Sequence, residues 1–264
     1  MRRREFLAGA AGLLGAACAS RLALANVPTP YSLDLDPPMD NREKFVAWGV
    51  ARRGEDPKYL GQRFDRFQAM VRNEDLLNDR HKRAFLMTPR EKFVLQQNLG
   101  RAYEHAFLDI GFGVTITGPH TVARMTNTLA VKRSDRVLEV GTGSGYQSAY
   151  LANLTPNVFS IEIIPPLAAR TRALYDRLIG EGYVEYLAIR TRNADGYYGW
   201  EERAPFDKII VTCGIDHIPP PLLQQMTPEG IMVIPVGPPG AQHVIKATKQ
   251  TAADGRVSVV RSDI

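Results

Sequence analysis

The stretch that decides the fold is Arg136-Val137-Leu138-Glu139-Val140-Gly141-Thr142-Gly143-Ser144-Gly145. Its first five residues, 136–140, predict a buried strand, and the glycines that follow predict a tight turn into a helix over 148–154. Glycine at such a turn lets the backbone approach a ligand closely. The stretch therefore predicts the ligand-binding edge of an open α/β sheet.

Strands and helices alternate on the C-terminal side of this turn. Apolar runs predict strands over 158–162, 208–212 and 231–235, with helices over 167–179 and 221–226 between them. Such alternation is typical of a parallel sheet wound with helices on both faces. We therefore expect an α/β fold of the Rossmann-like kind.

The sequence pattern is different on the N-terminal side of the turn. Residues 26–40 are rich in proline and aperiodic, which is typical of a linker. From residue 42 to 93, apolar residues at spacings of three and four predict amphipathic helices. We expect a linker and small helical region over 26–95, followed by the sheet domain over 96–264.

The glycine spacing indicates the class of ligand. It is G-x-G-x-G rather than the G-x-G-x-x-G of dinucleotide binders, and no Lys-Ser/Thr follows as in a P-loop. A nucleotide without a pyrophosphate fits better. Glu162 ends the next strand, where an acid can accept hydrogen bonds from both ribose hydroxyls of an adenosine. This pairing predicts an S-adenosylmethionine site; the alternative is a tight turn with solvated carboxylates.

Each candidate cofactor residue has an expected role. We expect Glu139 to face the cationic methionyl end of S-adenosylmethionine and Asp195-Gly196 to lie at the adenine edge. Glycines and the polar residues between them would contact the cofactor through the backbone: Gly141, Thr142, Gly143, Ser144 and Gly145.

Further motifs resemble one family, in order, over about residues 80–247. The most specific are the Thr115-Ile116-Thr117-Gly118-Pro119 loop and Gly145-Tyr146-Gln147 after the turn. Others are Pro89-Arg90-Glu91-Lys92-Phe93-Val94, Ala204-Pro205-Phe206-Asp207, Ile209-Ile210-Val211-Thr212 and Ile234-Pro235-Val236-Gly237. Together they resemble the protein-L-isoaspartate (D-aspartate) O-methyltransferase family.

The resemblance implies a protein-repair activity. The methyl group of S-adenosylmethionine is transferred to the free α-carboxylate of an L-isoaspartyl residue in a damaged protein. The ester then cyclises to a succinimide, whose hydrolysis returns some normal aspartate. An anionic acceptor and a sulfonium donor need alignment and desolvation more than a general base, so a catalytic His or a metal is not required.

The resemblance also assigns the acceptor site. Thr117 stands where the family has a Ser whose hydroxyl touches the acceptor carboxylate, so a hydroxyl is retained. Val114 and Gly118 also depart from the family's usual residues. The remaining substrate-binding candidates are Thr115, Gly118, Pro119 and His120, of which His120 also fits a surface or loop histidine.

The C-terminal end departs from the family pattern. Family members close with an antiparallel strand pair that ends in Phe-Val-Pro-Leu, whereas this sequence ends Val259-Val260-Arg261-Ser262-Asp263-Ile264. We therefore expect the last strand to be short or missing, which would leave an unpaired sheet edge.

The first 25 residues have the layout of an export signal. Arg2, Arg3 and Arg4 precede an apolar run over 6–19, and Ala23-Leu24-Ala25 is a small-x-small cleavage site. The Arg3-Arg4-x-Phe6-Leu7 pattern resembles a twin-arginine signal, which predicts a periplasmic protein. The alternative is a basic amphipathic helix or a misplaced start, with a cytoplasmic protein. Cys18 is a further candidate for lipid attachment.

Composition limits the other classes of function. Lys and Arg number 33 against 28 Asp and Glu, a net charge of +5, but the four arginines and one glutamate of residues 1–25 account for three of those charges. With no basic stripe and no Asn/Asp-Pro-Pro-Tyr/Phe motif, we expect no nucleic-acid partner. Two cysteines exclude a disulfide framework, and no further stretch of 18 apolar residues predicts a transmembrane segment.

We expect a monomer whose partners are proteins and peptides that contain isoaspartyl residues. Two alternatives stay open. Because S-adenosylmethionine is a cytosolic metabolite, an exported chain could be a non-catalytic binding or assembly factor that keeps the methyltransferase fold. It could also be an O-methyltransferase for another carboxylate.

Overall fold

The computed structural model describes residues 35–238, 240–252 and 257–264. The chain divides into residues 1–30 and a compact unit of residues 31–264. The predicted signal over 1–25, with Cys18, and the linker up to residue 34 lie outside the described residues. Every element below belongs to the second unit.

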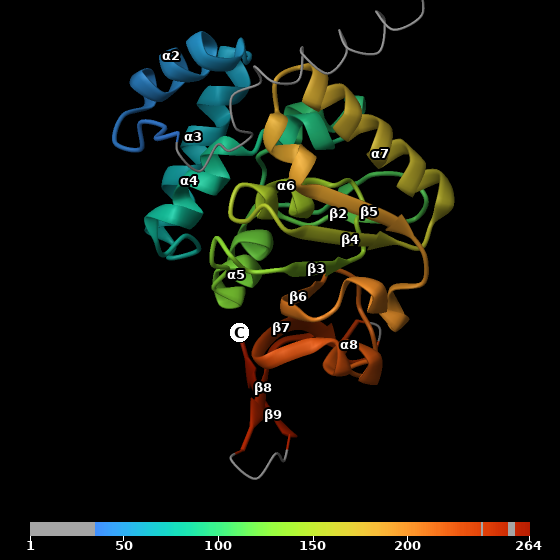
Figure 1. The fold of residues 1–264 in the computed structure, drawn as a ribbon. Coiled ribbons are helices and arrows are strands. Elements are labelled where there is room, and N and C mark those ends of the chain that lie inside the picture. The colour runs from blue at the N-terminus through green and yellow to red at the C-terminus, as the bar shows by residue number, and fades with distance from the viewer. Residues whose placement is uncertain (1–34, 239, 253–256) are drawn as a thin grey trace, which may run out of the picture. The chain divides into compact units, whose positions relative to one another are not determined.

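One seven-stranded sheet organises this unit, in the order β5-β4-β3-β6-β7-β8-β9 (Figure 1). Strands β5, β4, β3, β6 and β7 are parallel, and β8 and β9 are antiparallel to their neighbours. The strands are β3 (Val137–Val140), β4 (Val158–Glu162), β5 (Ile189–Asn193), β6 (Phe206–Val211), β7 (Met226–Val236), β8 (His243–Thr251) and β9 (Val257–Asp263). The expected Rossmann-like α/β fold is confirmed.

Helices and short 3-10 turns connect the strands. The α-helices of this part are α5 (Pro119–Leu129), α6 (Tyr146–Ala152), α7 (Pro165–Gly180) and α8 (Pro220–Gln224). The 3-10 turns are η2 (Arg90–Phe93), η3 (Gln96–Arg101), η4 (Val184–Ala188), η5 (Gly196–Tyr198) and η6 (Glu201–Arg203). All four residues of β3 are buried, and its apolar side chains enter two different hydrophobic clusters, Val137 one of them and Leu138 and Val140 the other. The cluster of Val137 includes Tyr146 of α6, whereas the cluster of Leu138 includes Leu222 of α8. The central strand is therefore covered on both faces.

Three helices occupy the region that the apolar spacing assigned to helices. They are α2 (Arg42–Arg53), α3 (Pro57–Arg72) and α4 (Asp79–Met87). Each follows a residue whose side chain accepts a backbone N–H of the first turn: Asn41, Asp56 and Asn78. Phe45 and Phe85 share one hydrophobic cluster with Tyr150 of α6. The boundary that we placed at residue 95 therefore does not separate two cores.

A buried ion network fixes α3. The Arg63 guanidinium donates to Glu55 at 2.6 Å, to Glu91 at 2.9 Å and to the Tyr103 hydroxyl at 2.9 Å. Arg63 is 1% exposed and both carboxylates are buried. Each buried charge depends on its partners, since an isolated charge in this interior would be strongly unfavourable.

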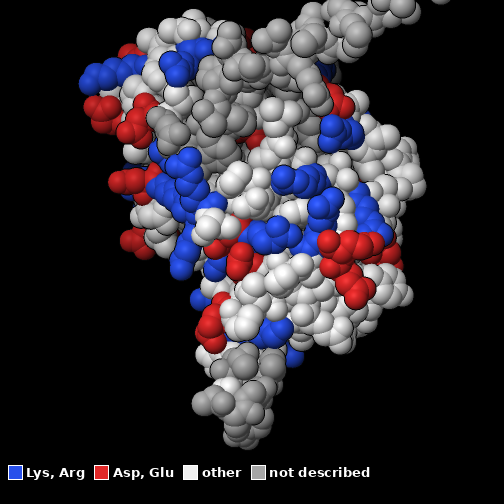
Figure 2. Space-filling view, in the orientation of Figure 1, with Lys and Arg blue, Asp and Glu red and all other residues white. Residues whose placement is uncertain are grey.

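Ion pairs between basic and acidic side chains occupy the surface. Arg42 and Asp65 lie 2.8 Å apart, Arg101 and Glu104 2.8 Å apart, and Arg172 and Asp176 3.0 Å apart. Figure 2 shows Lys and Arg side chains beside Asp and Glu side chains on the face it presents. Exposed pairs of this kind contribute little to stability, about 0–1 kcal/mol each.

The C-terminal end corrects the sequence prediction. The expected short or missing last strand is present as β9, which pairs antiparallel with β8 from Ile245↔Asp263 to Thr251↔Val257. Strand β8 in turn pairs with β7 from Ile231↔Thr248 to Val236↔His243. The absent Phe-Val-Pro-Leu ending misled the prediction, because pairing along a strand depends on the backbone rather than on one terminal motif. In Figure 1 the β8–β9 pair extends away from the helices.

A small hairpin leads into α5. Strands β1 (Leu108–Asp109) and β2 (Thr115–Ile116) pair antiparallel, and the turn between them has positive φ at Gly111, Phe112 and Gly113. None of the helices in the described residues combines the length and the apolar character needed to cross a bilayer.

Candidate functional site

The glycine turn after β3 has a backbone that only glycine adopts easily. Gly141, Gly143 and Gly145 have φ values of +99°, +55° and +90°. A β-carbon at Gly141 would lie 2.4 Å from Thr212 Oγ1, and one at Gly145 would lie 2.5 Å from the Tyr175 hydroxyl. The turn therefore passes too close to β6 and α7 for larger residues.

Neighbouring side chains hold this turn in place. The Thr171 hydroxyl donates to the Gly143 carbonyl at 2.6 Å, and the Tyr175 hydroxyl donates to the Gly145 carbonyl at 3.0 Å. Thr212 donates to the Gly141 carbonyl at 2.6 Å. These anchors leave the inner edge of the turn facing a cavity at the carboxyl ends of the strands.

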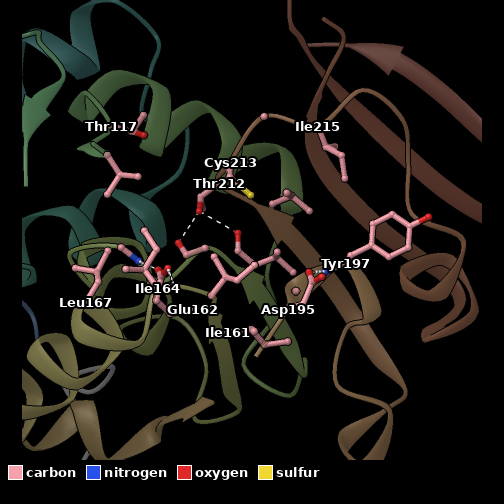
Figure 3. A pocket seen from close by; sticks show the side chains of 18 of the residues that line it. Thr117, Ile161, Glu162, Ile164, Leu167, Asp195, Tyr197, Thr212, Cys213 and Ile215 are labelled. Atoms are coloured by element: carbon pink, nitrogen blue, oxygen red, sulfur yellow. Dashed lines mark hydrogen bonds between the residues drawn. The ribbon is translucent and has the colours of Figure 1, made fainter. Parts of the chain in front are cut away.

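That outer cavity has a volume of about 610 Å³. It brings together the predicted cofactor residues Gly141, Gly143, Glu162, Asp195 and Gly196 with Thr115 and Thr117 of the predicted acceptor loop. Figure 3 shows Glu162, Asp195 and Thr212 around this space, with Thr117 at its far side. Residues from five separate segments of the chain thus converge at one edge of the sheet.

Glu162 is held rigidly at the end of β4. One carboxylate oxygen accepts the Gly143 N–H at 2.7 Å, and the other accepts the Ile164 N–H at 3.0 Å. The side chain is buried and lines the outer cavity. Since each carboxylate oxygen has a second lone pair, both can accept a further hydrogen bond from a ligand with two adjacent hydroxyls.

Asp195 and Gly196 follow β5 at the neighbouring strand end. The Asp195 carboxylate accepts the Tyr197 N–H at 2.9 Å and remains exposed to the cavity. A β-carbon at Gly196 would lie 2.4 Å from Val140 Cγ1, so glycine keeps this wall of the cavity close to β3.

A smaller inner cavity of about 60 Å³ adjoins the outer one, and both are lined by Thr115, Thr117, Gly141, Gly143 and Thr212. The inner cavity is further lined by the remaining predicted cofactor residues, Glu139, Thr142 and Ser144. Gly145 does not line either cavity; it shapes the turn.

Glu139 is the most perturbed acid of the site. Its side chain is fully buried, and one oxygen, Oε2, accepts hydrogen bonds from the hydroxyls of Ser148 and Ser160. Oε1 has no hydrogen-bond partner. Burial raises the pKa of Glu139 to about 8.

The acceptor-loop candidates divide into two groups. Thr115 and Thr117 line both cavities, whereas Gly118, Pro119 and His120 line neither. Gly118 precedes α5 and Pro119 begins it, and the half-buried His120 ring lies against His105 in a tilted arrangement, with centroids 3.4 Å apart. These three residues lie next to Thr117 in the chain but line neither cavity, so their role in substrate binding stays a prediction.

Sequence reasoning missed much of the cavity wall. The additional lining residues are apolar or weakly polar and include Phe107, Ile163, Ile164, Leu167, Tyr197, Cys213 and Ile215. Ile163 and Ile164 directly follow β4, and Cys213 comes shortly after β6, so position at a strand end was an available signal for these three. Cys213 remains exposed to solvent, but the protein around its thiol and the nearby Glu162 raise its pKa, which keeps it protonated.

The charge of the site fits a cationic ligand. Glu139, Glu162 and Asp195 line the two cavities, and no Lys, Arg or His of the described residues does so. No group of three described His, Cys, Asp or Glu residues could hold a metal ion. S-Adenosylmethionine carries a sulfonium and an ammonium, so the acids, and the unpartnered Glu139 Oε1 in particular, fit this cofactor.

Comparison with known proteins identifies the family. A family model described as protein-L-isoaspartate(D-aspartate) O-methyltransferase matches residues 65–262. Protein-L-isoaspartate O-methyltransferase 2 of Shewanella sediminis is 40% identical over 198 residues, 75% of this chain and 79% of that protein. Protein-L-isoaspartate O-methyltransferase of Anaeromyxobacter dehalogenans is 47% identical over 166 residues, 63% of this chain and 77% of that protein.

A solved structure agrees with the fold. It is a putative protein-L-isoaspartate O-methyltransferase from Plasmodium falciparum in complex with S-adenosyl-L-homocysteine. The TM-score is 0.63 at 21% identity, covering 76% of this chain and 93% of that one. Fold, site and sequence agree: the chain belongs to the protein-L-isoaspartate(D-aspartate) O-methyltransferase family.

Proposed function

We propose that this chain methylates the free α-carboxylate of L-isoaspartyl residues in damaged proteins, with S-adenosylmethionine as methyl donor. The proposal rests on one observation: the predicted cofactor residues and the predicted acceptor residue Thr117 line the same two adjoining cavities. Acids suited to a cationic cofactor line the cavities, and the Thr117 hydroxyl lines both. Acceptor and donor can therefore meet at this junction.

The residues present suit a direct displacement. S-Adenosylmethionine supplies an electrophilic methyl group on a sulfonium. An acceptor carboxylate oxygen forms a bond to the methyl carbon as the carbon–sulfur bond breaks, and the electron pair of that bond stays on sulfur. Thr117 can donate a hydrogen bond that orients the carboxylate, and Glu162 can hold the ribose. Phe107 and Ile163 add apolar side chains to the cavity wall and remain exposed to solvent. No proton has to be removed from the acceptor.

Methyl transfer between matched peptides tests this activity. The purified chain is incubated with S-adenosylmethionine labelled on the methyl group and with an isoaspartyl peptide or its normal aspartyl isomer. We expect base-labile methyl ester on the isoaspartyl peptide and background on its isomer. Equal labelling of both peptides would indicate an O-methyltransferase for another carboxylate, and labelling of neither would contradict the proposal.

We further propose that the chain is exported to the periplasm as a monomer. The support for export is the arginine-rich, then apolar, sequence of residues 1–25. A single chain supplies the walls of both cavities, which supports an active monomer. Cell fractionation with N-terminal sequencing tests export, and light scattering tests the monomer. A cytoplasmic protein that keeps Met1 would contradict export.

A further inference from the structure

Only one of the two oxygens of the buried Glu139 carboxyl group has hydrogen-bond partners. Glu139 belongs to the central strand β3 and is fully buried. Oε2 accepts from Ser160 Oγ at 2.6 Å and from Ser148 Oγ, and Ser160 is itself 2.6 Å from the Thr142 hydroxyl. Oε1, in contrast, has no partner. A buried acceptor in this state favours a ligand that brings a donor to it.

The surroundings of Glu139 do not supply a positive charge. The titratable groups that face it are Glu162 on β4 and Tyr175 on α7, while α6 and β4 present the two serine hydroxyls. Glu162 disfavours a second negative charge nearby, and the partner of Glu139 across β6 is the apolar Ile210. No described Lys, Arg or His hydrogen-bonds to or forms an ion pair with this carboxyl. Burial therefore keeps it a neutral acid near pH 7, with a pKa of about 8.

The position of this acid couples it to the cofactor. Glu139 lines the inner cavity, which shares Thr117, Gly141 and Gly143 with the outer cavity that would hold the nucleoside. The methionyl part of the cofactor carries an ammonium close to the sulfur. An ammonium in the inner cavity would bring both a donor for Oε1 and the missing positive charge.

We propose that Glu139 is protonated in the cofactor-free protein and releases this proton to solvent when the cationic end of the cofactor enters the inner cavity. The proposal rests on the proposed function, since it needs the cofactor to bind here. Binding then couples to pH, because the ionised carboxylate attracts the cation and the neutral acid does not. Glu139 acts as a positioning residue that also sets the pH range of tight binding.

The size of the linkage follows from the titration of Glu139. With its pKa at about 8, binding at about pH 7 would release about 0.9 proton per site if the bound form is fully ionised. Over the range from about pH 7 to about pH 8.5, affinity would rise about eightfold. Proton release would fall to zero once the free carboxyl is already ionised.

Isothermal titration calorimetry tests the linkage without turnover. S-Adenosyl-L-homocysteine, which keeps the ammonium but has no methyl group to transfer, is titrated in phosphate and in Tris at about pH 7. The difference in binding enthalpy between buffers reports protons released. We expect about 0.9 proton for the wild type and a release near zero for Glu139→Gln, whose amide can still accept the serine hydrogen bonds. The comparison cancels any titration of the ligand itself.

Glu162→Gln is the matched control. It removes a carboxylate from the same pocket, so it should weaken binding. Because Glu162 also helps to raise the pKa of Glu139, the proton release should fall below the wild-type value but stay well above that of Glu139→Gln. Equal release by the wild type and Glu139→Gln, or binding by the wild type without release, would overturn the proposal. Absence of any binding by the wild type would overturn the proposed function and the linkage with it.

An infrared measurement on the wild type covers the case in which Glu139→Gln does not fold. The C=O stretch of a protonated carboxyl should disappear from difference spectra when S-adenosyl-L-homocysteine binds at about pH 7. An unchanged protonated-carboxyl band in the bound state would overturn the proposal.

Discussion

Glu162→Ala tests the ribose assignment most sharply. In the structure, the Glu162 carboxylate already accepts two backbone N–H groups, from Gly143 at 2.7 Å and from Ile164 at 3.0 Å. These bonds fix the side chain at the end of β4 without using its remaining lone pairs. The substitution removes both potential acceptors for the ribose hydroxyls, and it also removes the acceptor that steadies the glycine turn.

The two effects have different sizes and different readouts. Loss of two charge-assisted hydrogen bonds to the ribose costs on the order of 2–4 kcal/mol, which corresponds to a Kd about 30- to 700-fold higher. Each backbone N–H left without an acceptor costs about 1–3 kcal/mol if it stays buried, and less where water reaches it. The first effect appears only in the Kd, whereas the second appears in the Tm of the ligand-free protein.

Calorimetric titration with S-adenosyl-L-homocysteine, together with the Tm of each ligand-free variant, separates them. Asn193→Ala is the matched control, because Asn193 donates to the Glu162 backbone carbonyl at 2.7 Å and lines neither cavity. It should lower the Tm and leave the Kd close to the wild-type value. A folded Glu162→Ala protein with an unchanged Kd would show that the ribose does not bind at Glu162.

Substitutions at three other residues test the acceptor site and the stability of the fold. Thr117→Ala should lower kcat and spare the Kd of the cofactor, while Thr117→Ser should keep most of the activity; a raised cofactor Kd with intact kcat in the Ala variant would contradict the assignment. Arg63→Ala should lower the free energy of unfolding by about 3–5 kcal/mol, because Glu55 and Glu91 lose their buried cation. Urea unfolding measures this free energy, and a decrease below about 1 kcal/mol would contradict the prediction. Burial lowers the pKa of His81 to about 4. Between about pH 6.5 and pH 4 the unfolded state therefore binds a proton that the folded state does not. The free energy of unfolding should fall as the pH falls through this range, by up to about 3 kcal/mol. His81→Gln should remove that part of the pH dependence of urea unfolding, and an unchanged wild-type slope in the variant would refute it.

The sequence was most informative where one local pattern determined the structure. Strand β4 has the predicted bounds, and β3 begins one residue later than predicted, because apolar runs closed by an acid or glycine are strong strand signals. Strand β7 runs from Met226 to Val236, longer than the predicted 231–235. Its early part contains Pro228 and Gly230, and its pairing with β6 shifts register between Phe206 and Lys208. Such an irregularity depends on the partner strand.

Features that depend on contacts between distant segments of the chain could not be predicted from local sequence patterns. The pairing of β9 with β8 depends on two strands meeting in space, so the missing terminal motif suggested a missing strand. The sequence placed Glu139 at the cofactor site but gave no sign that Ser148 and Ser160 would bury its carboxyl. Likewise, the loop signal grouped Thr117 with His120, although only Thr117 lines the cavities, because the start of α5 turns His120 toward His105.

Recovery of normal aspartate from a damaged peptide tests the central claim most directly. An isoaspartyl peptide is incubated with the chain and S-adenosylmethionine through repeated methylation and succinimide hydrolysis, and its two isomers are quantified by chromatography. We expect the aspartyl isomer to accumulate only when both enzyme and cofactor are present, and to appear more slowly with Thr117→Ala. An isoaspartyl peptide that stays unconverted in the presence of bound cofactor would contradict the proposed repair activity.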